Sequence, residues 1–153
     1  MAYTDPPPTA AALPPGATFD PSFIGRGLRF PISVDHRGAI ALVSGPEAVE
    51  CALRVVLSTA PGERVMRPNF GCGIWDLLFE PINANTLGLM AQAVREAVAQ
   101  WEPRVNLLDV IITPDRRESS LVRIALTYEI RTTNDRRNLV YPFYVIPREP
   151  EEL

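Results

Sequence analysis

Three glutamates, Glu63, Glu80 and Glu102, are the side chains of this sequence that raise the possibility of acid–base chemistry. Glycoside cleavage needs two carboxyl groups on either side of a sugar, one of which must keep its proton. An arginine follows Glu63 directly and follows Glu102 after one proline, and Glu80 precedes a proline. A neighbouring guanidinium lowers the proton affinity of a carboxylate, which is the opposite of what a general acid needs. A hydrolase is therefore less expected than a structural role.

The other candidate groups are few. His36 is the only histidine and lies in a polar turn, where surface exposure is expected. Cys51 and Cys72 show no CxxC spacing, which favours inert, reduced thiols over a metal site or a disulfide framework. The sequence also lacks a glycine loop of the phosphate-binding kind. We therefore expect no catalytic residues, no cofactor and no metal.

The triplet Glu102-Pro103-Arg104 stands where an apolar helical pattern changes to a strand-like one. Pro103 disfavours the helical conformation for Glu102, so the helix should end there and the chain should become extended. Residues two apart in extended chain point the same way, so Glu102 and Arg104 should share one side. Two interpretations remain even: a local ion pair that joins helix to strand, or a binding site for a partner.

Composition sets the broad class of the protein. A chain of 153 residues with 46% apolar residues and a net charge of -3 is typical of one globular domain and not of a nucleic-acid binder. It holds no apolar run of ~20 residues and no export signal. Residues 1–22 contain six of the sixteen prolines and predict a flexible tail, which leaves a single domain over 23–153.

The first half of that domain predicts a hairpin and helices. Residues 30–34 and 39–43 should be short strands around the turn 35–38. Ser44 is expected to cap the next helix, and Pro61-Gly62 should end it. A short apolar helix over 74–80 should follow. Asn85 should cap a longer helix, whose apolar stripe comprises Leu87, Met90, Val94, Val98 and Trp101.

The second half predicts a three-stranded meander. Residues 121–131 alternate between apolar and polar, as in an antiparallel strand with one wet face. Turns are expected at 115–119 and 134–137. The last strand, 138–146, contains Pro142, which favours a sheet edge. The predicted class is α+β: a small, mostly antiparallel sheet of hairpin and meander, packed on one face by two main helices and a short one.

Four stretches together resemble a known family: residues 23–32, 62–81 (GERVMRPNFGCGIWDLLFEP), 101–104 (WEPR) and 138–146 (NLVYPFYVI). They are similar to the gene-25-type baseplate wedge proteins, which carry a lysozyme-like superfamily label. Such proteins occur in contractile phage tails, type VI secretion systems and extracellular contractile injection systems. The similarity covers about residues 23–146, in order and at family-like spacing.

The resemblance implies a structural baseplate component that starts the contractile sheath. Glu102, Pro103 and Arg104 would bind a helical bundle formed by the two larger wedge proteins. Such a site is expected to be an exposed ion pair that contributes only roughly 0–1 kcal/mol to the fold. Inner tube or hub proteins are further implied partners, with six copies per particle, no nucleic acid and no membrane. The protein would assemble in the bacterial cytoplasm and then form part of the particle.

The resemblance also implies a second contact, with the first sheath ring. Extended sheath arms would add to the last strand, and Leu139, Tyr141, Phe143 and Val145 are the residues expected to receive them. Two alternatives compete with this wedge and sheath-initiator function. One is a peptidoglycan-cleaving, lysozyme-like enzyme, and the other is a soluble regulatory adaptor of the same fold class.

Overall fold

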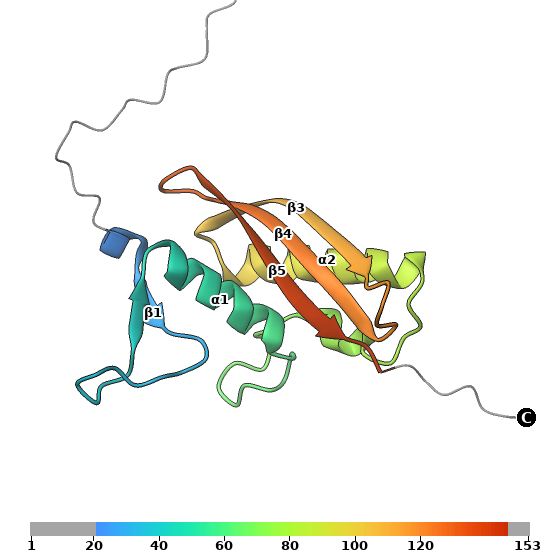
Figure 1. The fold of residues 1–153 in the computed structure, drawn as a ribbon, viewed down its shortest axis with the longest axis horizontal. Coiled ribbons are helices and arrows are strands. Elements are labelled where there is room, and N and C mark those ends of the chain that lie inside the picture. Colours follow the sequence, from blue (N-terminus) through green and yellow to red (C-terminus); the bar gives the residue numbers. More distant parts are fainter. Residues whose placement is uncertain (1–20, 147–153) are drawn as a thin grey trace, which may run out of the picture.

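The computed structural model describes residues 21–146 of the chain (Figure 1). Two short 3-10 helices, η1 and η2, accompany two α-helices and five strands. Their order is η1 (Pro21–Ile24), β1 (Arg26–Leu28), β2 (Leu42–Ser44), α1 (Pro46–Ser58), η2 (Gly73–Leu77), α2 (Ala84–Trp101), β3 (Val105–Pro114), β4 (Leu121–Ile130) and β5 (Asp135–Tyr144). Residues 1–20 of the predicted tail lie outside the described part, and η1 begins two residues before the predicted domain boundary.

The N-terminal hairpin forms, but its strands are shorter and farther from the turn than the sequence predicts. β1 pairs with β2 in the register Gly27↔Val43, and the expected strands meet only at a single bridge, Val34↔Ile40. Pro31 has no N–H to donate to a ladder, which explains why pairing stops between these two points. The predicted turn is confirmed, because Asp35 Oδ1 accepts hydrogen bonds from two backbone N–H groups within it, at 2.8 and 3.0 Å.

The N-cap of helix α1 lies one residue later than predicted. Ser44 remains in β2, paired with Arg26, and Gly45 is the N-cap residue, without a side-chain cap. The φ of Gly45 is 66°, a left-handed value that a glycine adopts without a Cβ penalty, so the chain can turn sharply from strand into helix. The prediction of a Ser44 cap was therefore wrong, whereas the helix itself and its end before Pro61 are confirmed.

The cap of α2 also differs from the prediction. Asn83, not Asn85, caps this helix, and its side chain accepts a hydrogen bond from the Thr86 N–H at 3.0 Å. Asn85 instead lies exposed in the first turn. The predicted apolar stripe is confirmed, with Met90, Val94 and Val98 fully buried. The expected short helix at 74–80 is the 3-10 helix η2, which ends three residues early.

The three-stranded sheet has the order β3-β4-β5, all antiparallel. Every even-numbered residue of β4 is buried, as the alternation predicts, and β5 lies at an edge, as Pro142 predicts. The turn before β5 is earlier than expected, because β5 already begins at Asp135. Asn134 makes that turn with a φ of 52°, which asparagine tolerates better than most residues.

The helices and the sheet share one core. Buried side chains of α1, α2 and η2 meet those on one face of β3–β5, and the opposite face stays open, with Ile111, Val140 and Tyr144 more than half exposed. Figure 1 shows the hairpin beside α1, away from this sheet, as a separate two-stranded sheet. The predicted α+β class is confirmed.

The position of the α2 cap gives a direct test. Asn83→Ala should lower the free energy of unfolding by about 1 kcal/mol, because the Thr86 N–H loses its acceptor. Asn85→Ala is the matched control and should change stability by less than roughly 0.5 kcal/mol, as expected for a surface position. Urea unfolding of both variants measures the two values. A larger loss for Asn85→Ala than for Asn83→Ala would contradict the observed cap.

Candidate functional site

The triplet Glu102-Pro103-Arg104 forms the joint between α2 and β3. Glu102 ends the helix, with its N–H donating to Val98 O at 2.9 Å, and its φ and ψ of -126° and 76° are no longer helical. The Val105 N–H donates back to Glu102 O at 3.3 Å, so the triplet is a turn, and β3 starts at Val105. The helix end is confirmed, but the extended conformation predicted for the triplet was wrong.

This turn brings the two charged side chains together more closely than an extended chain would. Arg104 Nε donates to Glu102 Oε1 and Arg104 Nη2 donates to Glu102 Oε2, both at 2.6 Å. Two parallel, charge-assisted bonds of this kind fix the relative orientation of both groups. These hydrogen bonds also raise the pKa of Arg104 above its ordinary value, against the lowering effect of burial.

The pair is much less exposed than the sequence predicts. The Glu102 side chain is only 3% exposed, whereas that of Arg104 is 32% exposed. An approaching partner can therefore touch Pro103 and the outer part of Arg104, but not the Glu102 carboxylate. The prediction of a surface ion pair was wrong, because the Glu102 carboxylate is buried. Glu102 positions Arg104 and balances its charge.

Arg104 also connects the joint to two other parts of the chain. Its Nη1 donates to Ile24 O at 3.4 Å, just before β1. The φ of Gly25 is 110°, a left-handed value that favours glycine, and a Cβ there would lie 3.4 Å from that same Nη1. On the other side, the Arg131 N–H donates to Arg104 O at 2.9 Å. The Arg104 side chain thus joins the helix end to the N-terminal segment, and its backbone carbonyl holds the residue that follows β4.

An aromatic contact extends the site toward the loop between α1 and η2. Trp101, directly before the triplet, packs on Phe70 with ring centroids 5.1 Å apart, and the Arg64 guanidinium lies 4.0 Å from the Phe70 ring centre. Arg64 and Phe70 both belong to the motif GERVMRPNFG, but their position beside Trp101 was not predicted from the sequence. The motif marked these two residues as notable, but the spacing of residues along the chain could not predict that they would lie near Trp101.

The strand expected to receive sheath arms is present, but its named side chains face inward. Leu139, Phe143 and Val145 are 2–3% exposed, and Tyr141 is half-buried. They form part of the core beneath the sheet, because every second residue of β5 points toward the helices. The side chains of Leu139, Phe143 and Val145 are thus not accessible to a partner, which corrects these three members of the predicted set, and Tyr141 is only partly accessible. Over residues 139–144, the exposed side chains are those of Val140, Pro142 and Tyr144.

The backbone of β5 follows the same alternation. The Val145 N–H donates to Ser120 O on the β4 side at 2.7 Å, and the Ile146 N–H donates to Leu78 O on the opposite side at 2.9 Å. Successive residues of an antiparallel strand direct their hydrogen-bonding groups to opposite edges, so the N–H groups of Val140 and Tyr144 face away from β4. Within the described residues, no backbone hydrogen bond joins residues 138–144 to any segment besides β4.

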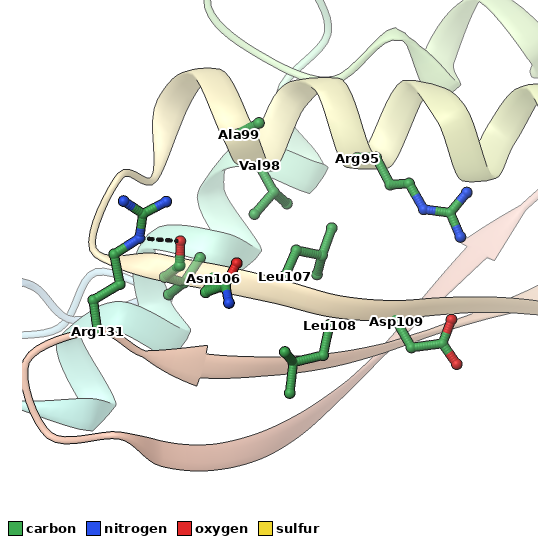
Figure 2. A pocket seen from close by; sticks show the side chains of 9 residues that line it. Arg95, Val98, Ala99, Asn106, Leu107, Leu108, Asp109 and Arg131 are labelled. Atoms are coloured by element: carbon green, nitrogen blue, oxygen red, sulfur yellow. Dashed lines mark hydrogen bonds between the residues drawn. The ribbon is translucent and has the colours of Figure 1, made fainter.

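A hollow that the sequence did not indicate lies between α2 and β3, with a volume of about 280 Å³ (Figure 2). A register shift between Leu107 and Asp109 bends β3 at this point and leaves Leu108 42% exposed. Figure 2 shows Arg95 of α2 and Asp109 of β3 at one end, and the bond from Arg131 Nε to Val105 O at the other. Its lining has one carboxylate and two arginines, which gives no acid pair.

Among residues 21–146, no hydrogen bond joins one candidate catalytic group to another. His36 is exposed in its turn, and the oxygens of Glu63 and Glu102 are engaged by the Ala60 N–H and by Arg104. Both cysteines are buried as free thiols, and burial raises the pKa of Cys72 to about 11, so this thiol is protonated at neutral pH. Over residues 21–146, no cluster of acidic, histidine and cysteine side chains could hold a metal, and no helix has the length and apolarity to cross a membrane.

The burial of Glu102 predicts a stability effect that an exposed pair would not have. Arg104→Ala should lower the free energy of unfolding by about 2–3 kcal/mol, because a buried carboxylate loses its charged donor. Arg137→Ala is the matched control, since the Arg137–Asp135 pair has a similar bond of 2.7 Å but is exposed, and it should cost only about 0–1 kcal/mol. Chemical unfolding measures both. If both variants lose the same free energy of unfolding, the buried pair contributes no more to stability than the exposed pair, which would contradict this prediction.

Comparisons with known proteins identify the family of this chain. Residues 43–135, more than half of the chain, match the profile of the family described as baseplate wedge protein gp25. The baseplate wedge protein gp25 of Enterobacteria phage T4 is 30% identical over 91 residues, which cover 60% of this chain and 69% of that protein.

Two solved structures are similar along most of the chain. One is a Geobacter sulfurreducens protein named "putative tail lysozyme", 48% identical, with a TM-score of 0.65 over 71% of this chain and 97% of that one. The other belongs to the six-fold symmetrised baseplate of the anti-feeding prophage, 31% identical, with a TM-score of 0.59 over 82% of this chain and 89% of that one. On the match of sequence and fold together, this chain belongs to the gp25 family of baseplate wedge proteins.

Proposed function

We propose that this protein is a structural subunit of the baseplate of a contractile injection system or phage tail. In this role it joins the larger wedge proteins through the triplet Glu102-Pro103-Arg104 and starts the sheath at the free edge of β5. Membership of the gp25 family and the likeness to an anti-feeding prophage baseplate subunit support the baseplate role. The six-fold symmetry of that baseplate supports an expectation of six copies per particle. Inner tube or hub proteins remain further proposed partners.

The observation that carries wedge binding is the preorganisation of Arg104. Its guanidinium is already held by two bonds of 2.6 Å, and 32% of the side chain is open to a partner. A group that is fixed before binding loses little conformational freedom on binding. The rigid ring of the exposed Pro103 beside it adds a surface that needs no ordering.

A non-enzymatic role fits the carboxylates better than glycoside cleavage. Both oxygens of Glu102 accept hydrogen bonds from Arg104, so they are occupied as acceptors and do not face a space where a sugar could bind. Glu63 is engaged by the Ala60 N–H at 3.0 Å. Peptidoglycan cleavage is the second candidate function, because the Geobacter protein is named a putative tail lysozyme. None of the contacts described for this chain favours it.

The free edge of β5 supports sheath initiation by strand addition. An added strand needs N–H and C=O groups that point outward, and the alternation along β5 gives these groups to Val140 and Tyr144. Pro142, between them, lacks an N–H and shortens the stretch that another chain can pair with, which is one way that proteins protect a sheet edge. The arms would thus meet the backbone and the outer face of β5, and not its buried side chains.

Val140→Pro should prevent sheath growth, since it removes an outward N–H and leaves the bonds to β4 intact. Val140→Thr is the matched control, because it keeps the N–H and the β-branched shape. The measurement is electron microscopy of particles from the reconstituted gene cluster. We expect baseplates with tubes but no sheath for the proline variant, and sheathed particles for the threonine variant. Normal sheaths on Val140→Pro particles, with a melting temperature near that of the unaltered protein, would exclude this edge as the start site.

A further inference from the structure

A groove of about 250 Å³ lies between β1, α1 and the loop that follows α1, and it ends at the triplet. This volume is below the ~300–1,000 Å³ typical of small-molecule pockets, so the groove fits side chains of another protein better than a metabolite. The residues on which its chemistry depends are Arg26, Leu28, Arg64, Trp101 and Arg104, and we call it the arginine groove.

The charge of the arginine groove is one-sided. Its lining contains Arg26, Arg64 and Arg104 and no carboxylate, although the whole chain has a net charge of -3. Arg104 is balanced by Glu102 from outside the groove. Arg26 and Arg64, both exposed, form no ion pair with any described residue. Two uncompensated guanidinium groups beside a third therefore create a local positive potential, which attracts carboxylates.

Apolar side chains accompany these charges. Leu28 lines the groove and is 52% exposed. The loop that carries Arg64 also presents Val65 and Met66, which are 95% and 92% exposed. Adjacent large apolar residues with such exposure mark an interaction surface more often than an unused one. The contacts from Arg64 to Phe70 and from Phe70 to Trp101 hold this loop against the residue that precedes the triplet.

We propose that the arginine groove binds an apolar segment bearing aspartate or glutamate side chains, contributed by one of the larger wedge proteins. The apolar side chains of the segment would cover Leu28 and the Val65-Met66 tip, while its carboxylates would meet Arg26 and Arg64. This proposal rests on the proposed wedge function and extends it, because it makes the triplet one end of a longer contact. A nucleic acid would meet the same charges but would not bury the apolar residues.

Charge reversal tests the proposal. We expect Arg26→Glu and Arg64→Glu each to weaken binding to the purified larger wedge proteins of the same particle by about tenfold, because a close charge pair becomes repulsive. Arg116→Glu is the matched control: Arg116 is exposed on the turn between β3 and β4, and its reversal should change the affinity by less than about twofold. Calorimetric titration at two salt concentrations measures the affinities. Arg26 has no ion pair to lose, so its variant should keep the unaltered melting temperature.

The chemistry of the segment is tested by cross-linking. Benzoylphenylalanine in place of Leu28 should cross-link, in the assembled wedge, to a peptide that carries Asp or Glu among apolar residues. A cross-linked peptide without acidic residues would overturn the proposal, as would unchanged affinity in both charge-reversed variants. In either case, if the unaltered protein still binds the larger wedge proteins, the proposed wedge function is not contradicted. If the unaltered protein itself fails to bind the wedge proteins, the wedge function fails too. If the unaltered protein binds a 20-base-pair DNA probe and Arg26→Glu abolishes this binding, the ligand of the groove is a nucleic acid and the proposal is overturned.

Discussion

The ion pair between Glu102 and Arg104 is the interaction on which the geometry of this protein's proposed site depends. A buried carboxylate is unfavourable unless a charged donor satisfies it, and Arg104 does so through two bonds of 2.6 Å. Once Arg104 is held there, its Nη1 reaches Ile24 O, and its backbone carbonyl accepts the Arg131 N–H. The end of α2, the approach to β1 and the end of β4 thus meet at one residue.

The two edges of the three-stranded sheet differ in a way that matters for assembly. β3 has a register shift between Leu107 and Asp109 and runs beside α2, so its edge is bent and carries an acidic side chain. Bulges and charges of this kind discourage the addition of another strand. β5 pairs with β4 in an unbroken register, and only Pro142 lacks an N–H along its outer edge. The sheet is therefore more open to strand addition at β5 than at β3.

Much of the fold could be predicted from the sequence, because its elements have strong local periodicity. The alternation in β4 and the apolar stripe of α2 fixed their inward faces, and Pro142 indicated an edge. The predictions that were wrong depend on contacts between distant segments. Two asparagines near the start of α2 were both able to cap it, and only the helix phase set by the core selects Asn83. The burial of Glu102 was not predictable either, since it results from packing around the joint. The inward direction of Leu139 and Phe143 was available in their spacing and should have excluded them as contact residues.

Whether Glu102 holds Arg104 in place for a partner can be seen in a high-resolution cryo-electron microscopy map of the assembled baseplate. We expect Arg104 to keep both bonds to Glu102 in the particle, while its exposed side and Pro103 contact a larger wedge protein. A map in which Arg104 has left Glu102, or in which solvent surrounds the triplet, would contradict this expectation.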